Sequence, residues 1–252
     1  MLGSSRNLKE VVLSVLMRKD EIMDYLPKGR LDAFADGVFA IVITLLVLDL
    51  AVPEGSTDIV AGLLQEWFVF LAYLISFAFI GSLWISHSSV TRLMKQETTH
   101  SYRLTLLMLF FVSLLPFTTK LMATYLGHPP DVPELIYGLD LMSATRMLNA
   151  ITRAAIGTEV MIYGLNLMAA TLALIAIIRS AIITPEIHAD ESAENELNAL
   201  LKREQLGAVI IVCTLILGII FPLVAVSGFI VVSILFFLTP SITTVKATLR
   251  KK

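Results

Sequence analysis

The chain has 252 residues, of which 56% are hydrophobic and only 16% are charged, and its formal net charge is −2. Soluble domains are typically about 45–50% apolar and about 25% charged, so this composition excludes an ordinary soluble protein and indicates an integral membrane protein. The single cysteine, Cys213, excludes a disulfide framework within the chain.

The chain starts with a segment, residues 1–29, that has no continuous apolar run. Between residues 8 and 26 the apolar side chains recur at helical spacing, which predicts an amphipathic helix before the first membrane span. Such a helix either lies on the membrane surface or contacts symmetry-related copies of the chain, and the sequence favours neither alternative.

Six apolar runs follow, each close to the length of about 20 residues that a helix needs to cross a membrane. We therefore predict an all-α membrane protein with six transmembrane helices. Val226, Ser227 and Gly228 are predicted to form a tight hairpin between the last two. Pro116 and Pro222 are predicted to kink the helices that contain them. The predicted spans are residues 34–52, 67–90, 104–126, 159–180, 206–226 and 228–245.

Lysine and arginine are concentrated on one side of the predicted spans. Sixteen of the 19 fall before the first span, in the second-to-third and fourth-to-fifth connections, or after the last span. Because positive charge accumulates on the cytoplasmic side, both termini are predicted to be cytoplasmic. The predicted organisation is an N-terminal segment (1–29), a six-helix transmembrane domain (30–246) and a basic tail (247–252).

Two connections between the spans are unusual. The predicted external loop, residues 127–158, contains "IYGLDLMSAT" (136–145), which returns as "IYGLNLMAAT" (162–171). We interpret the repeat as a local duplication that lengthens the loop. The predicted cytoplasmic linker, residues 181–205, is acidic and rich in alanine, glutamate and leucine, which favours a solvated helix. A regulatory cation site is the alternative.

Ionisable residues near the ends of the first two spans are functional candidates, since charge within a membrane is costly. Asp36 lies one or two turns inside the first span, and Arg30 precedes it by six residues. Trp84 and His87 share a helical face near the same end of the second span, because residues three apart are neighbours on a helix. These groups are predicted to form a buried polar cluster. The cluster either locks the two helices together or lets His87 sense protons, since imidazole titrates near neutral pH.

The stretch "RLDAFADGVFA" (30–40) at the start of the first span, with "WISH" (84–87) near the end of the second, resembles the transmembrane protein 175 family of potassium channels. The family motif is arginine, three residues, then Phe-Ser-Asp. Arg30, Phe34 and Asp36 match this motif, and Ala35 replaces the serine. The resemblance covers most of residues 28–245.

The resemblance implies a homotetramer in which four copies of the first helix line a central pore. It implies that Ile41 forms a hydrophobic constriction and that Thr44 contributes to potassium selection. Leu45 and Leu48 would add further apolar layers. These four positions share one helical face, but their neighbours are equally apolar, so periodicity alone selects no face. Asp49 either concentrates cations at the external mouth or is an ordinary interfacial residue.

The gating mechanism expected from this resemblance is dewetting at an apolar constriction. The chain has no Thr-Val-Gly-Tyr-Gly-like loop, so rings of backbone carbonyls are not available to replace the hydration shell of the ion. The predicted partners are other copies of the chain, the lipid bilayer and monovalent cations, in the plasma membrane, with no nucleic acid and no cofactor.

Three classes of function remain after this reasoning. A potassium-selective cation channel is the first. A proton-coupled secondary transporter, or a proton leak pathway through Asp36 and His87, is the second. A non-conducting scaffold or an enzyme is the third, but the sequence contains no nucleotide-binding loop or catalytic dyad, and we predict that the chain is not an enzyme. His128 and His188 lack neighbouring ligands at metal spacing, so no metal site is predicted.

Overall fold

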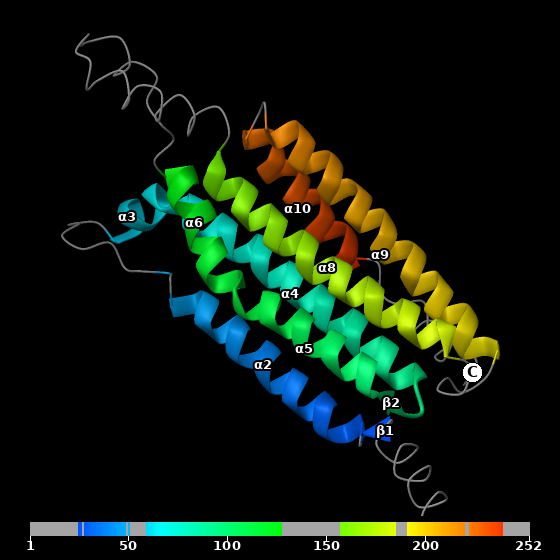
Figure 1. The fold of residues 1–252 in the computed structure, drawn as a ribbon. Coiled ribbons are helices and arrows are strands. Elements are labelled where there is room, and N and C mark those ends of the chain that lie inside the picture. Colours follow the sequence, from blue (N-terminus) through cyan, green and yellow to red (C-terminus); the bar gives the residue numbers. More distant parts are fainter. Residues whose placement is uncertain are drawn as a thin grey trace, which may run out of the picture.

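The computed structural model describes residues 25–26, 28–48, 50, 59–127, 157–184, 191–219 and 222–238. The predicted amphipathic helix before residue 25, Asp49, the duplicated segment 136–145 and the basic tail 247–252 lie outside these residues. Within the described residues the protein is a bundle of long helices that run side by side (Figure 1). The helices are α2 (Lys28–Leu48), α3 (Ile59–Gln65), α4 (Trp67–Leu93), α5 (Thr99–Ser113), α6 (Leu115–Gly127), α8 (Thr158–Ile183), α9 (Glu191–Gly218) and α10 (Pro222–Leu238).

Four stretches of helix are long and apolar enough to cross a membrane, and they correspond to the first four predicted spans. The protein is therefore an all-helical, multi-pass membrane protein, apart from one short β-ladder. In α10 the apolar stretch Val224–Phe237 is shorter than these four. The four stretches are Gly29–Leu48, Trp67–Leu93, Thr99–Leu126 and Thr158–Ile183.

The third span is broken at Leu114, between α5 and α6, as Pro116 predicted. Proline has no N–H to donate and its ring clashes with the preceding turn, so the helix cannot continue regularly through it. The Asn166 side chain of α8 stabilises the break, because its Nδ2 donates to the carbonyl of Phe111 at 3.2 Å and to Thr118 Oγ1 at 3.3 Å. A carbonyl next to the break thus receives a partner inside the bundle.

The predicted hairpin at Val226–Gly228 is wrong. The chain reverses between Gly218 and Pro222, and residues 226–228 lie inside α10. Pro222 does not kink a span but begins α10, where proline is favoured because the first N–H groups of a helix have no partner in the helix. Gly228 serves close packing instead of a turn, since a Cβ placed there would lie 2.3 Å from Thr214 Oγ1 of α9.

A two-residue antiparallel ladder joins β1 (Tyr25–Leu26) to β2 (Glu97–Thr98). The sequence did not predict it. The ladder ties the chain just before α2 to the turn between α4 and α5, at the same end of the bundle (Figure 1). It therefore anchors the beginning of α2 against its neighbours.

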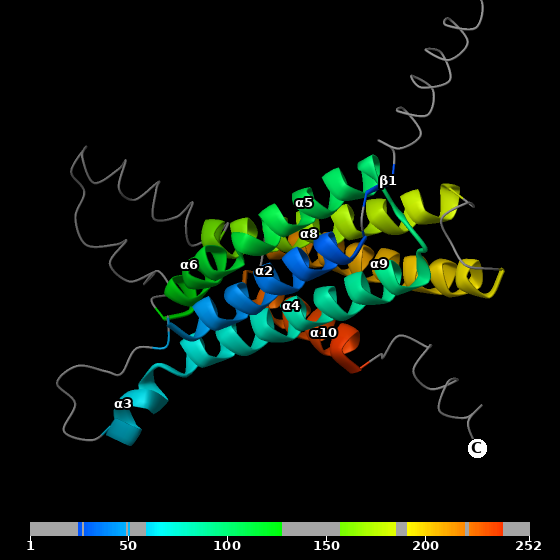
Figure 2. The ribbon, with the colours of Figure 1, turned by 90° about the horizontal axis from the view of Figure 1, so that it is seen from below.

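The central helix of the bundle is α8, which packs against α5, α6 and α9 (Figure 2). Its side chains Tyr163, Leu167, Leu174 and Ile178 have no exposed surface. The Tyr163 hydroxyl lies 3.0 Å from Ser76 Oγ of α4, which in turn lies 2.7 Å from Thr119 Oγ1 of α6. By contrast, α2 packs against α4 and α5 at the edge of the bundle (Figure 1), so one of its faces has no neighbour among the described residues.

Candidate functional site

The buried face of α2 is a stripe of five apolar residues directed at α4 and α5. Their spacing of three or four residues places them on one side of the helix, because each residue advances about 100°. Each is at most 3% exposed, so the rotation of α2 about its own axis is well defined. The five residues are Leu31, Ala35, Phe39, Val42 and Leu46.

The opposite, outward face of α2 carries the four residues implied to line a pore. Ile41 is 60% exposed, Leu48 is 76% exposed, and Thr44 is also exposed. Leu45, at 42%, lies towards the edge of this face. The Thr44 hydroxyl donates to the carbonyl of Ile41 at 2.7 Å, so its proton is held by the helix and its lone pairs remain available on the outward side. The periodicity of the sequence does not determine which face of α2 points outwards, whereas the packing of α2 in the structure does.

Apart from Phe34, the residues on the outward face of α2 before Ile41 include three small ones. Ala33, Gly37 and Ala40 are all exposed, and a Cβ built on Gly37 would meet no other atom within 4 Å. Gly37 precedes Ile41 by four residues and Thr44 by seven, which places it near the centre of the outward face. The sequence reasoning missed Gly37, although its spacing from Ile41 was a signal that could have found it.

Asp36 and Trp84 are brought together, at an exposed position and not in the buried cluster that the sequence predicts. The indole Nε1 of Trp84 donates to Asp36 Oδ1 at 2.8 Å and so joins α4 to α2. His87 is only 1% exposed and lies beside Phe39, with ring centroids 6.3 Å apart. Its Nε2 is buried and has no hydrogen-bond partner among the described residues. His87 therefore lies behind the hydrogen-bonded pair, between α4 and the buried face of α2.

Arg30 and Phe34 are not part of this cluster. The separation of six positions between Arg30 and Asp36 corresponds to about 600°, which turns the two side chains onto different sides of α2. Arg30 is exposed, and within the described part of the chain it makes no hydrogen bond or ion pair with Asp36. Phe34 is 54% exposed on the outward face, close to the line of Ile41. The predicted cluster is thus smaller than expected.

A second polar cluster, which the sequence reasoning missed, lies on the other side of α4. Ser86 Oγ donates to Glu204 Oε1 at 2.9 Å, and Arg203 Nη2 donates to the same oxygen at 2.8 Å and also to Ser86. The Arg203 guanidinium lies 5.6 Å from the centre of the Phe236 ring of α10. Glu204 is 1% exposed, so this ion pair joins three helices inside the protein.

The linker that contains this cluster is helical, as its composition indicated, but only one of its sides is solvated. Residues 191–204 form the first half of α9, and Ala193, Leu197 and Leu200 are buried along with Glu204. Their spacing is helical, so the linker packs on the bundle with one face. Residues 185–190 lie outside the described part of the chain.

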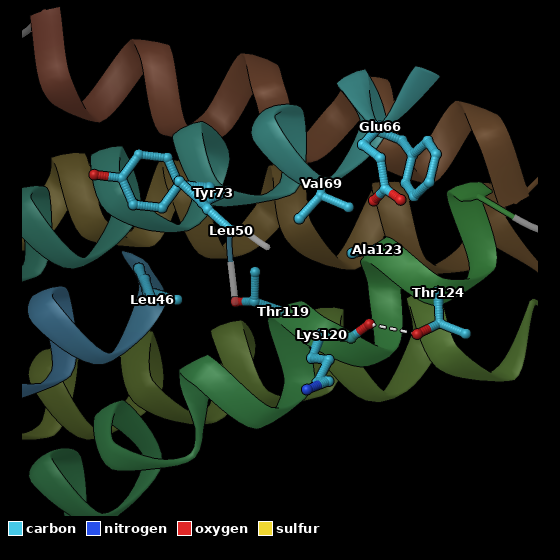
Figure 3. A pocket seen from close by; sticks show the side chains of 10 residues that line it. Leu46, Leu50, Glu66, Val69, Tyr73, Thr119, Lys120, Ala123 and Thr124 are labelled. Atoms are coloured by element: carbon cyan, nitrogen blue, oxygen red, sulfur yellow. Dashed lines mark hydrogen bonds between the residues drawn. The ribbon is translucent and has the colours of Figure 1, made fainter. Parts of the chain in front are cut away.

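A cavity of about 220 Å³ lies behind the far end of α2, between α2, α4 and α6 (Figure 3). Leu46, Val69 and Ala123 contribute apolar surface, and Glu66 and Lys120 are the charged residues of its lining. Because Leu46 belongs to the buried face of α2, this cavity is separate from the outward face.

Among the described residues no group of three histidine, cysteine or acidic side chains could hold a metal ion.

Residues 30–116, which include the outward face of α2 and the Asp36–Trp84 pair, match the family described as the endosomal/lysosomal potassium channel TMEM175. The family that this chain resembles is thus TMEM175. The resemblance that the motif residues indicated is therefore confirmed. The TMEM175 family is one of ion channels and not of enzymes.

Individual TMEM175 relatives support this assignment. A potassium channel of Chamaesiphon minutus is 42% identical over 105 residues, which are 40% of this chain and 52% of that relative. The human endosomal/lysosomal proton channel TMEM175 is 36% identical over 126 residues, which are 46% of this chain and 25% of that protein. The matched segments thus span about half of the Chamaesiphon relative and a quarter of the human protein.

A solved structure extends the similarity to most of the chain. The crystal structure of a lysosomal potassium-selective channel TMEM175 homolog from Chamaesiphon minutus superposes with a TM-score of 0.65 and 27% identity. The superposition covers 84% of this chain and 96% of that one, so the fold described above is the TMEM175 fold.

Proposed function

We propose that this chain forms a potassium-selective cation channel in the cell membrane, as a homotetramer with both termini cytoplasmic and with α2 lining the pore. The observation that carries the proposal is the outward face of α2, which presents Ile41, Thr44 and Leu48 away from the rest of the chain. The relative named a potassium channel and the solved potassium-selective homolog support the choice of ion.

The polarity of the outward side of α2 argues that it does not face lipid. Asp36 is exposed within the candidate span Gly29–Leu48. An acidic side chain at the centre of a membrane helix costs about 2.5–3.5 kcal/mol on insertion scales. Thr44 and Gly37, also exposed, add a hydroxyl and a bare backbone to the same side. A surface of this kind is better accommodated by water and neighbouring copies of α2 than by acyl chains.

The order of residues along α2 supports a hydrophobic gate. Between Phe34 and Ile41 the small residues Gly37 and Ala40 leave space, and the larger side chains of Ile41, Leu45 and Leu48 follow. A ring of Ile41 side chains would exclude water when narrow and conduct hydrated or partly hydrated ions when wide. Thr44 would supply hydroxyl oxygens one turn further along. Asp49, just beyond Leu48, would attract cations to the mouth.

The bi-ionic reversal potential of the purified protein in planar bilayers, with potassium against sodium, tests this function. A reversal potential close to that of potassium is expected. An ohmic current that does not discriminate between the two ions would contradict potassium selectivity. Intact protein in the bilayer that carries no current would contradict an open pore.

Proton conduction is the second candidate function, because the human relative is named a proton channel and because His87 is buried beside the Asp36–Trp84 pair. A pH gradient across proteoliposomes with equal potassium on both sides tests this alternative. Proton flux that grows with the driving force would support a proton leak pathway. Flux that saturates and carries a second solute would support a proton-coupled transporter.

A further inference from the structure

A pocket of about 590 Å³ lies at the end of the bundle where α5 begins and α8 ends. Thr99 and His100 line it from α5, and Arg179, Ser180 and Thr184 line it from the end of α8. The two helices pack against each other, and the start of α5 and the end of α8 lie at the same end of the bundle (Figure 1). It is separate from the outward face of α2.

The lining of this pocket matches the chemistry of a phosphate group. Arg179 offers a planar guanidinium that can donate two parallel hydrogen bonds to phosphate oxygens. His100 offers a ring N–H in either protonation state, and the hydroxyls of Thr99, Ser180 and Thr184 can donate to the remaining oxygens. None of the described residues that line the pocket is acidic. The complementary ligand is therefore an anion with several oxygen acceptors.

The position of the pocket along the helices corresponds to the level of lipid headgroups. The candidate spans Thr99–Leu126 and Thr158–Ile183 have their ends at the pocket, so its polar residues lie where hydrocarbon gives way to water. The same end of the bundle carries Arg92, Lys95 and Arg103, all of them exposed. Positive charge at this level attracts anionic lipid headgroups, by about 1 kcal/mol per lysine or arginine.

An apolar stripe on α8 leads from the pocket towards the centre of the span. Ala176 lines the pocket, and Leu172 and Leu165 precede it by four and eleven residues, which places all three on one side of the helix. Leu172 is 52% exposed and Leu165 is 57% exposed. A ligand with its anionic group between Arg179 and His100 could thus lay an acyl chain along this stripe.

We infer that the pocket between the start of α5 and the end of α8 binds the phosphate of an anionic phospholipid, with Arg179 as its main ligand. The inference does not depend on conduction through α2, because lipid binding can be measured without current. Free phosphate shares the headgroup chemistry, but the exposed stripe of α8 favours the lipid.

Native mass spectrometry of the purified full-length protein tests the inference, with phosphatidylglycerol and phosphatidylcholine of identical acyl chains as probes. The wild-type protein should retain phosphatidylglycerol in preference to phosphatidylcholine. Removing one positive charge near an anionic lipid lowers this preference about fivefold, and Arg179→Gln should lower it further, because the hydrogen bonds to the phosphate are lost as well. Arg179 is exposed, so its replacement leaves no buried group without a hydrogen-bond or ion-pair partner.

Lys95→Gln is the matched control, because it removes one charge from the same end of the bundle outside the pocket. It should lower the lipid preference by no more than about fivefold, because Lys95 attracts the headgroup only through its charge. Ala176→Leu, which adds bulk to the pocket lining without changing its charge, should also weaken retention of phosphatidylglycerol. An unchanged preference in Arg179→Gln, or an equal loss in Lys95→Gln, would overturn the inference.

Competition with inorganic phosphate separates the two sources of the anionic group. Millimolar inorganic phosphate should not displace phosphatidylglycerol from the wild-type protein, because it lacks the contacts of the acyl chain. Displacement of the lipid by phosphate alone would overturn the lipid assignment and identify a soluble phosphate compound as the ligand.

Discussion

The indole Nε1 of Trp84 lies 2.8 Å from Asp36 Oδ1, and this hydrogen bond joins two helices through residues 48 positions apart. It holds α4 against α2. Phe39 and His87, each three residues further along its own helix, pack against each other on the buried side of the hydrogen bond. The rotation of α2, and with it the set of residues on its outward face, therefore depends on a contact between two motif residues.

Trp84→Phe keeps an aromatic ring but removes the N–H donor together with part of the indole. We expect it to lower the free energy of unfolding by about 1 kcal/mol, less than the 1.5–3 kcal/mol of a buried hydrogen bond to a charged group, because Trp84 is 42% exposed. Thermal unfolding in detergent measures the change. Trp67→Phe, at an exposed tryptophan with no contact of this kind among the described residues, is the control and should be neutral.

Ile41→Asn places a polar group at the proposed constriction. We expect a larger current and a weaker preference for potassium over sodium, because a polar ring keeps the pore wet. Single-channel conductance and reversal potential in planar bilayers report both effects. Ile216→Asn on α9 is the matched control, since Ile216 is 59% exposed and Ile41 is 60% exposed. Equal effects of the two substitutions would argue against a pore along α2.

Thr44→Val preserves the shape of the side chain and removes its oxygen. If Thr44 hydroxyls contact the ion, the potassium preference should fall severalfold while conduction persists, because a methyl group cannot replace water around a cation. Thr124→Val is the control, because Thr124 is also exposed and its hydroxyl also bonds a carbonyl of its own helix, that of Lys120 at 2.9 Å. Identical reversal potentials in Thr44→Val and wild type would exclude the role.

Gly37→Leu fills the open space one turn before Ile41. Among the described residues, nothing beyond the backbone of α2 itself lies within 4 Å of a Cβ added at Gly37, so the fold should tolerate the substitution. Four copies that face a common axis would nevertheless narrow the path. We expect lower single-channel conductance with unchanged thermal stability. Gly81→Leu, at a helical glycine of α4 with the same open surroundings, should leave conductance unaltered.

Arg203→Met leaves the buried carboxylate of Glu204 without its ion-pair partner. Breaking one half of a buried pair typically costs about 3–5 kcal/mol, so the unfolding temperature in detergent should fall clearly. Adding Glu204→Gln to Arg203→Met should restore much of the loss, because it removes the stranded charge. Lys202→Met, at the exposed neighbouring position, is the control. A loss no larger than that of Lys202→Met would show that the pair contributes little.

The membrane class, the four long apolar spans and the family were accessible from the sequence because they depend on local properties. A run of apolar residues predicts a span whatever surrounds it, and Arg30, Phe34 and Asp36 carry the family motif at fixed spacing. The break at Pro116 follows from the missing N–H of proline and could be predicted for the same reason. The role of Ile41 as a constriction stays a prediction.

Only the tertiary structure decided which features of these helices face inwards. The apolar residues of α2 are alike in sequence, and packing against α4 and α5 turned Val42 and Leu46 inwards and Ile41 and Thr44 outwards. Pro222 fitted the start of a helix better than its middle, and Gly228 was required by the close approach of Thr214. In the sequence Glu204 belongs to a linker that is predicted to be solvated, but in the structure it is buried and contacts Ser86 and Arg203. Each of these outcomes depends on residues far apart in the chain, which local patterns do not contain.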